Sequence, residues 1–470
     1  MIDDVTTLAF DVLVIGSGPA GQKAAIQARK AGRKVAVVEQ EKGVGGMCVQ
    51  RGTIPSKTLR ETALSLARLR RGAELLDFKL RPDMEVSSLM TRLDQVVKAN
   101  VAYLGRQLER NGIHRLYGRG RFVNADTVEI LSVDGSRSRV TAQTIMIATG
   151  SRPRTPAEIP VDHENVLDSD SILSMLYLPQ SLTVLGGGVI ACEYASIFAH
   201  LGVRVTMIDR TPRPLAFMDA DLVGKFVQAF EHNGGRYLGG QTIGSVEWDG
   251  ISQVITRLGN GETVSSDKML VALGRVAAVD GLDLAAAGLA ATQRGLLAVD
   301  EHCRTVVPHI YAIGDVIGPP SLAATAMEQG RRAARHALGL GPGLPSEMIP
   351  IGIYTIPEMA SVGLSADEAE KRTPGTIIGQ ARFDEVARGQ ISGIQDGLLK
   401  LVCDPSGKKL LGVHIVGEGA TELIHVGQMA MLGREGGADV DLFVENTFNF
   451  PTLAEAYRVA ALDVWERRGG

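Results

Sequence analysis

The chain has 470 residues, of which 45% are hydrophobic and 22% are charged, and its formal net charge is −4. This length accommodates two or three domains that each bury a core. The charge balance excludes a basic surface for nucleic acid, and no dense run of Lys and Arg marks a membrane surface, so we expect small soluble ligands.

The N-terminal residues and the cysteines bear on the location of the protein and on whether it holds a metal. Residues 1–10 are acidic and lack the basic start, apolar core and cleavage site of a secretory signal. No apolar run reaches the length that spans a bilayer, so we expect a cytoplasmic protein without membrane contact. Cys48, Cys192, Cys303 and Cys403 show neither metal-ligand spacing nor a disulfide framework, and we therefore expect no metal site.

The first predicted unit is a strand, a glycine turn, a helix and a second strand that ends on an acid. An apolar run at 11–15 leads into the turn, Gly32 stops the helix, and the run 35–38 ends on Glu39. The glycines of the turn are Gly16, Gly18 and Gly21. The first permits a tight turn, the second lets the backbone approach a pyrophosphate, and the third lets helix and strand pack closely. The helix N-terminus favours phosphate, and Glu39 can accept ribose hydroxyls.

A second copy of this pattern follows later in the chain. Its landmarks are Gly186, Gly188, Ala191, Gly202 and Asp209, each 170 positions after its counterpart (186−16, 188−18, 191−21, 202−32 and 209−39). One such motif alone also fits a turn that serves only packing, but five landmarks in one register are hard to assign to chance. The sequence therefore predicts two dinucleotide sites, each at the carboxyl end of its own parallel sheet.

The second site differs from the first around its acid. Ala191 replaces the third glycine, which we expect to open the helix and strand slightly. Asp209 favours the free 2′-hydroxyl of NAD, whereas Arg210 and Arg213 can take the 2′-phosphate of NADP in bidentate fashion. The alternative is that both arginines are solvated loop charges, so the sequence allows NAD and NADP without deciding between them.

The remaining patterns predict scaffold elements and two further turns. We expect helices at 58–71 and 95–110, strands within 122–140 around an Asp134-Gly135 turn, a linker at 153–160, strands near 144–150, 269–275 and 309–315, a boundary at 339–345, and strands followed by helices thereafter. Two of these strands end in small turns of the kind found at nucleotide sites, Thr149-Gly150 and Gly274-Arg275.

Taken together, these motifs resemble the two-dinucleotide-binding flavoprotein disulfide reductases, the family of lipoamide dehydrogenase, glutathione reductase and mercuric reductase. The resemblance covers essentially the whole chain and implies an α/β fold with two Rossmann-like domains and an α+β dimerisation domain, hence a homodimer or higher homo-oligomer. The implied domains are an FAD-binding domain at 1–150, an NAD(P)-binding domain at 151–278, a central segment returning to FAD at 279–345, and a dimerisation domain at 346–470.

The resemblance also implies roles for single residues around a non-covalent FAD. Glu39 would hold the FAD ribose, Asp315 the ribityl and phosphate region, and Lys57 would lie beside the flavin N5 and pair with Glu193. A lysine there stabilises the negative charge that develops when the flavin accepts a hydride. The plainer alternative makes Lys57 and Glu193 unrelated surface charges. By the same resemblance, the stretch before the lysine would contribute Gly45, Gly46 and Cys48 to the flavin pocket.

Two departures from the family pattern concern its redox chemistry. Disulfide reductases carry a second cysteine where this chain has Thr53, and a catalytic histidine where it has Phe450. Phenylalanine cannot move a proton, so the base that activates a dithiol is missing together with one sulfur. Without that imidazole, Glu455 reads as a helix-terminus or surface charge. Cys48 is then a small buried residue or a passive part of the flavin pocket, and electrons do not leave through a disulfide.

One branch of the family shares these departures, the soluble pyridine nucleotide transhydrogenases. The blocks of resemblance are 52–57, 168–173, 193–198, 350–358 and 454–462, and the branch usually has an aromatic residue at the Phe450 position. The resemblance implies that NADPH gives a hydride to FAD and departs, and that NAD then takes the hydride from the same pocket in a ping-pong sequence. The alternatives are a diaphorase or quinone reductase, and a non-catalytic flavin-binding redox protein.

Overall fold

The computed structural model describes residues 6–76, 86–343, 348–394, 396–433 and 439–469. The chain divides into two compact units. The first comprises residues 1–58, 85–154 and 274–345, and the second comprises residues 59–84, 155–273 and 346–470. The four domains predicted from the sequence, and the three boundaries between them, stay predictions.

The first unit is built on a seven-stranded sheet with the order β3-β2-β1-β6-β5-β4, in which β17 also pairs with β6. β1, β2, β3, β6 and β17 pair in parallel, whereas β4 and β5 extend the sheet in antiparallel fashion. The strands are β1 (Thr7–Ile15), β2 (Val35–Glu39), β3 (His114–Tyr117), β4 (Arg119–Asn124), β5 (Thr127–Leu131), β6 (Arg137–Ile147) and β17 (Ile310–Ala312). The predicted strand, turn, helix and strand at the start of the chain are confirmed.

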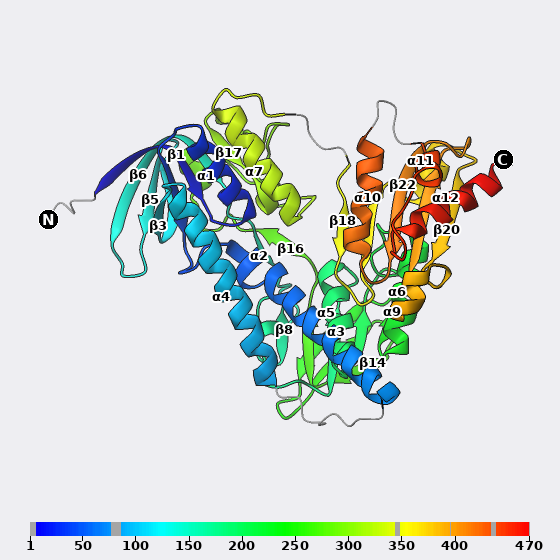
Figure 1. The fold of residues 1–470 in the computed structure, drawn as a ribbon. Coiled ribbons are helices and arrows are strands. Elements are labelled where there is room, and N and C mark those ends of the chain that lie inside the picture. The colour runs from blue at the N-terminus through cyan, green and yellow to red at the C-terminus, as the bar shows by residue number, and fades with distance from the viewer. Residues whose placement is uncertain (1–5, 77–85, 344–347, 395, 434–438, 470) are drawn as a thin grey trace. The chain divides into compact units, whose positions relative to one another are not determined.

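Helices α1 (Pro19–Lys30) and α7 (Ala323–Ala337) lie side by side in the first unit (Figure 1). Pro19 at the first turn suits the start of α1, because its missing N–H would be unpaired there in any case. Alanines of both helices are buried in one core cluster with Val12 and Val14 of β1. Small side chains on both helices let them approach closely: a β-carbon at Gly330 would lie 2.1 Å from the carbonyl oxygen of Ala20.

Among the described residues, six further elements lie wholly in the first unit. They are α2 (Gly46–Gln50), α4 (Val86–Arg110), β7 (Ser151–Pro153), β16 (Arg275–Ala277), η2 (Leu284–Ala287) and η3 (Gly314–Ile317). Helix α3 (Thr53–Leu76) begins in the first unit and continues in the second. The helices predicted at 58–71 and 95–110 are both present, and each is longer than predicted.

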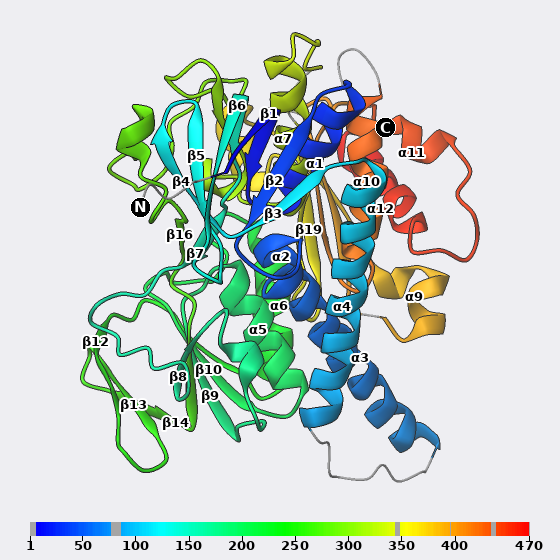
Figure 2. The ribbon, with the colours of Figure 1, turned by 90° about the vertical axis from the view of Figure 1, so that its left-hand side faces the viewer.

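The second unit contains an entirely parallel sheet with the order β11-β10-β9-β15-β8. Figure 2 shows it beside α5, which follows the second glycine turn. The elements are β8 (Val166–Asp168), β9 (Ser181–Leu185), α5 (Val189–His200), β10 (Arg204–Ile208), α6 (Ala220–His232), β11 (Arg236–Leu238) and β15 (Lys268–Val271), with η1 (Ile172–Ser174) after β8.

The strand register confirms that the two glycine units are copies of one design. Val12 of β1 pairs with Val35 of β2, and Leu182 of β9 pairs with Val205 of β10. Both members of the second pair lie 170 positions after those of the first (182−12 and 205−35). The sequence offset therefore extends to the hydrogen-bonded pairing of the strands.

Two antiparallel sheets complete the second unit. One is β12 (Ile243–Trp248), β13 (Val254–Leu258) and β14 (Thr263–Ser266), which form a separate sheet in Figure 2. The other has the order β18-β19-β22-β21-β20, with β18 (Ile351–Ile353), β19 (Met359–Gly363), β20 (Ile377–Arg382), β21 (Leu398–Cys403) and β22 (Leu410–Val416). One face of this sheet packs with α10 (Ala420–Leu432), α11 (Asp441–Glu445) and α12 (Glu455–Arg467) around Tyr457.

The predicted order of strands followed by helices is incomplete for this region. Helices α8 (Ala366–Arg372) and α9 (Ala387–Ser392), with η4 (Phe383–Glu385), lie between the strands. Both helices are too short to show helical periodicity, and local signals start and end them. Ser365 and Glu368 form a capping box at α8, and Gly393 ends α9 in the left-handed region.

Within the described residues, no helix is both long enough and apolar enough to cross a membrane.

We predict that Gly330→Ala lowers the thermal unfolding midpoint, because the new methyl group meets the backbone of α1 and overpacking of this kind costs about 1–3 kcal/mol. The matched control is Gly224→Ala in α6, where nothing lies within 4 Å of the added β-carbon. That control should unfold at the same or a higher temperature, because alanine is the better helix former. Equal midpoints for the two variants would contradict the close packing of α1 and α7.

Candidate functional site

The first glycine loop joins β1 to α1 at the carboxyl end of the parallel strands. Gly16 has φ +105°, and a β-carbon there would lie 2.3 Å from the carbonyl oxygen of Ala148 at the end of β6. A β-carbon at Gly21 would lie 2.0 Å from the Gly16 carbonyl oxygen, so a side chain at either position would force this turn apart. Gly18 instead has nothing within 4 Å of an added β-carbon, which leaves its backbone open to a pyrophosphate.

Glu39 is buried at the end of β2 and held by the same loop. One carboxylate oxygen accepts hydrogen bonds from the Ser17 backbone N–H at 3.0 Å and the Ser17 hydroxyl at 2.6 Å. The other accepts the backbone N–H of Glu41 at 3.0 Å. Ser17 was not predicted from the sequence, although its place between Gly16 and Gly18 and before a buried acid is the signal that could have identified it.

Thr149 and Gly150 follow β6 at the same end of the sheet. The Thr149 hydroxyl is buried and has no hydrogen-bond partner among the residues that the structure describes. Because an unpaired buried hydroxyl costs free energy, its position next to the glycine loop fits a ligand that supplies the missing partner. Gly150 has open space where a side chain would be, as does Gly274 before β16.

Asp315 lies at the start of η3, and two other residues orient it. Its carboxylate accepts the Ser151 hydroxyl at 2.7 Å, and that hydroxyl accepts Arg275 Nε at 2.8 Å. Arg275 also donates to the Ser151 carbonyl oxygen at 2.7 Å. The sequence predicted Asp315 and the two strand-end turns but not this relay, because its members are distant along the chain.

The stretch from Gly45 to Lys57 packs on the first glycine loop. A β-carbon at Gly46 would lie 2.9 Å from the Gly18 Cα, and the Gly45 N–H donates to the Ser17 carbonyl oxygen at 3.2 Å. Burial raises the pKa of the Cys48 thiol, and a hydrogen bond with the Thr53 side chain acts in the opposite direction. Thr53, at the position of the family's second cysteine, therefore contacts the Cys48 thiol through its hydroxyl. All four cysteines are unpaired.

The second glycine loop repeats the first at the end of β9. Gly186 has φ +116°, and a β-carbon there would lie 2.6 Å from the carbonyl oxygen of Ala272. Gly188 has nothing within 4 Å of an added β-carbon, and Ala191 is fully buried in α5. The loop is therefore open to a pyrophosphate at the position equivalent to Gly18.

The acid of the second site lies beside charged loop residues. Asp209 follows β10, Arg210 is exposed, and Arg213 is half-buried. Arg213 donates to the carbonyl oxygens of Ala216 at 3.2 Å and Met218 at 3.3 Å, so its guanidinium holds its own loop together. Arg210 is the arginine that solvent, or a phosphate, can reach.

Glu193 is buried in α5, where one carboxylate oxygen accepts the Tyr354 N–H at 2.9 Å. Lys57 belongs to the first unit and Glu193 to the second. Their pairing stays a prediction from the sequence. Tyr354 was not predicted as a partner of Glu193, because the two residues are far apart in the chain.

Phe450 and Glu455 are the C-terminal residues for which the sequence predicts a loss of acid–base chemistry, and that loss stays a prediction. Phe450 stands at the histidine position and is 69% exposed. Glu455 is the first residue of α12, and its carboxylate accepts the Thr452 N–H at 3.1 Å. This confirms the prediction that Glu455 acts as a helix-terminus charge. Within the described residues, no group of three or more His, Cys, Asp or Glu side chains is arranged to hold a metal ion.

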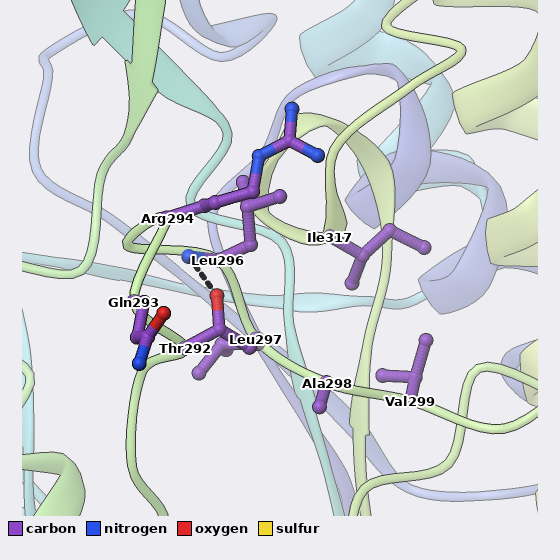
Figure 3. Close-up of a pocket in the computed structure, with 8 residues that line it drawn as sticks. All are labelled: Thr292, Gln293, Arg294, Leu296, Leu297, Ala298, Val299 and Ile317. Atoms are coloured by element: carbon purple, nitrogen blue, oxygen red, sulfur yellow. Dashed lines mark hydrogen bonds between the residues drawn. The ribbon is translucent and has the colours of Figure 1, made fainter.

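A cavity of about 580 Å³ lies in the first unit between a turn and η3 (Figure 3). Its turn is closed by the Leu296 N–H, which donates to the Thr292 hydroxyl at 3.2 Å. The lining residues are Thr292, Gln293, Arg294, Leu296, Leu297, Ala298, Val299 and Ile317. None of the residues predicted to bind a dinucleotide lines it, so the cavity is separate from the glycine loops.

Comparison with known families covers most of the chain. Residues 10–330 match the model of pyridine nucleotide-disulphide oxidoreductases, and residues 349–461 match the model of the dimerisation domain of the same proteins. The chain belongs to the pyridine nucleotide-disulphide oxidoreductase family. The α/β fold class and the family predicted from the sequence are thereby confirmed.

Individual proteins similar to this chain include soluble pyridine nucleotide transhydrogenases and proteins of known structure. The chain is 43% identical to a soluble pyridine nucleotide transhydrogenase of Mycobacterium tuberculosis over 97% of both chains, and 40% identical to one of Vibrio vulnificus over 97% of both. Among solved structures, LpdA of Mycobacterium tuberculosis aligns with a TM-score of 0.88 at 28% identity over 97% of this chain and 99% of that one. RclA of Escherichia coli, a flavoprotein disulfide reductase, shares the fold with a TM-score of 0.86 at 23% identity.

We predict that Thr149→Val weakens retention of the FAD expected in the first unit about fivefold, because a hydrogen bond to a buried hydroxyl contributes about 1 kcal/mol. Free and bound FAD are measured after ultrafiltration. Thr256→Val in β13 is the matched control, since the Thr256 hydroxyl is likewise buried and has no partner among the described residues. Equal FAD retention in the two variants would show that the Thr149 hydroxyl does not face the cofactor.

Proposed function

We propose that the protein is a transhydrogenase that transfers a hydride from NADPH to NAD with the help of a non-covalently bound FAD. The proposal rests on one combined observation. The chain has two copies of one glycine turn, and it lacks both the second cysteine and the histidine that a redox-active dithiol needs. The relatives named soluble pyridine nucleotide transhydrogenases, at 40–43% identity, support it.

The residues of the first unit fit a dinucleotide such as FAD. Gly18 leaves its backbone open, the carboxylate of Glu39 is held in place for ribose hydroxyls, and the Thr149 hydroxyl lacks a partner within the described structure. When bound, FAD supplies the group that accepts a hydride from one nicotinamide and returns it to another. In this proposal Ser151 orients Asp315 toward the cofactor.

Lys57 and Glu193 are the proposed catalytic residues. A lysine ammonium beside the flavin lowers the free energy of the negative charge that builds up during hydride transfer. We propose that Glu193 balances this ammonium, because the Glu193 carboxylate is buried and a buried charge needs a partner of opposite sign. Gly45 and Gly46 bring the stretch that carries Cys48 and Lys57 against the glycine loop.

The same stretch supports an enzyme without a redox-active disulfide. A disulfide exchange needs two sulfur atoms, and the hydroxyl of Thr53 is bonded to the one thiol at this place. Phe450 offers no proton acceptor at the histidine position. Hydride taken from one nicotinamide is then handed to a second one that enters the same site after the first has left.

The second glycine loop is the proposed site for both nicotinamide dinucleotides. Gly186, Gly188 and Ala191 form its turn, Asp209 takes the ribose of NAD, and the exposed Arg210 takes the 2′-phosphate of NADP. The NADP+/NADPH and NAD+/NADH couples have nearly equal reduction potentials. The protein therefore needs only to lower the barrier to hydride transfer and to shield the reduced flavin from oxygen.

We further propose that the enzyme works as a cytoplasmic homodimer. The match of residues 349–461 to the dimerisation domain of the family supports self-association. Phe450, exposed in the single chain, then has a partner surface to meet. NADPH and NAD are dissolved cofactors of the cytoplasm, which supports that location.

We predict that the FAD-loaded protein reduces thionicotinamide-NAD with NADPH under anaerobic conditions, followed by the absorbance of the reduced analogue. Lys57→Met should keep its FAD but transfer hydride about a hundredfold more slowly, because it loses a charge that stabilises the transition state. Lys42→Met changes an exposed lysine and should be as fast as the unmodified protein. Reduction of a quinone without reduction of the NAD analogue would favour a quinone reductase, and no turnover of either would favour a binding protein.

A further inference from the structure

We propose that Thr211 is a specificity-determining residue that lets the second dinucleotide site accept both NADP(H) and NAD(H). Its hydroxyl is bonded to the carboxylate of Asp209, the group that would otherwise repel the 2′-phosphate of NADP(H). The inference rests on the proposed function, since it assumes that both dinucleotides enter this site.

Only one oxygen of the Asp209 carboxylate accepts hydrogen bonds within the described residues. Its Oδ2 atom lies against the glycine loop, where a β-carbon at Gly187 would be 2.7 Å away. Oδ2 accepts both the Thr211 hydroxyl and the Thr211 backbone N–H, the latter at 3.3 Å. Within the described structure Oδ1 has no hydrogen-bond partner, so it is available to a ribose hydroxyl.

Thr211 has a second acceptor within reach of its hydroxyl. The hydroxyl lies 2.9 Å from the carbonyl oxygen of Arg213, but it carries a single hydrogen and can donate to one acceptor at a time. Rotation of that hydrogen moves the bond from Asp209 to the Arg213 carbonyl oxygen. The site therefore has two hydrogen-bonding states with the same positions of the heavier atoms.

The loop around Thr211 is held in place by its neighbours. The Thr211 carbonyl oxygen accepts the Tyr237 hydroxyl at 2.9 Å and the Gly240 N–H at 3.1 Å. Burial raises the pKa of Tyr237 to about 12, so this phenol remains a donor at neutral pH. Arg213 braces the far end of the loop through its bonds to backbone carbonyl oxygens.

The two hydrogen-bonding states suit the two ligands. A 2′-phosphate near a bare carboxylate is repelled, and a hydroxyl donated to that carboxylate offsets part of its charge while Arg210 supplies a cation. A free ribose instead donates its own hydroxyls to Asp209. The Thr211 hydrogen can then turn to Arg213, so that neither nucleotide leaves a polar group unpaired.

The first site shows the contrasting arrangement. There the equivalent acid, Glu39, has both oxygens bonded, and the hydroxyl comes from Ser17 inside the glycine loop. The equivalent of Ser17 in the second site is Gly187 (187−17 is 170), which has no side chain, and the hydroxyl comes from Thr211 instead. The supporting hydroxyl thus lies on the loop that carries Arg210.

The test measures dissociation constants of NADP and NAD on the FAD-loaded protein by titration calorimetry. Thr211→Val should raise the NADP constant about tenfold and change the NAD constant less than about twofold, which corresponds to one charge-assisted hydrogen bond. Thr211→Ser keeps the hydroxyl and should keep the ratio of the two constants. Arg210→Gln serves as the positive control, because it should weaken NADP binding whether or not Thr211 affects specificity.

A double variant isolates the cause. In an Asp209→Asn background the repelling charge is gone, so adding Thr211→Val should no longer change the ratio of the constants. A Thr211→Val variant with an unchanged ratio, or with both constants raised equally, would overturn the inference and leave the proposed function standing. If the unmodified protein fails to bind either NADP or NAD, the proposed function itself fails.

Discussion

The two dinucleotide sites depend on one steric constraint, the close approach of a glycine turn to the end of a neighbouring strand. At Gly16 and at Gly186 a β-carbon would lie 2.3 Å and 2.6 Å from the carbonyl oxygens of Ala148 and Ala272. Because no side chain fits there, the first strand, the helix and the acid after the second strand all take fixed places around the turn. The constraint occurs twice with the same strand register, and the proposed chemistry needs both copies.

Differences between the two copies support the different tasks proposed for them. The first site bonds both oxygens of Glu39 and keeps a buried, unpaired threonine hydroxyl nearby, which suits a cofactor that stays bound. The second site leaves one oxygen of Asp209 and the guanidinium of Arg210 accessible, which suits substrates that come and go. The Cys48 stretch supplies no second sulfur, so we expect no redox centre there beside the flavin.

Much of this arrangement could be predicted from the sequence, because the glycines, the acids and the offset of 170 are local patterns that recur. The supporting hydrogen bonds could not, since they join residues that only the fold brings together, such as Ser151 with Asp315. Short helices such as α8 were also not predicted, because capping rather than periodicity defines them. The predicted Lys57–Glu193 pair remains a prediction.

The central claim is that a single flavin, without a redox-active disulfide, carries the electrons. The most direct test is an anaerobic titration of the FAD-loaded protein with NADPH, followed by visible absorbance. The account predicts that reduction is complete after one hydride equivalent for each bound FAD, with no band for charge transfer from a thiolate to the flavin. Uptake of twice that amount, with such a band, would reveal a second sulfur that forms a reducible disulfide with Cys48, and would contradict the account.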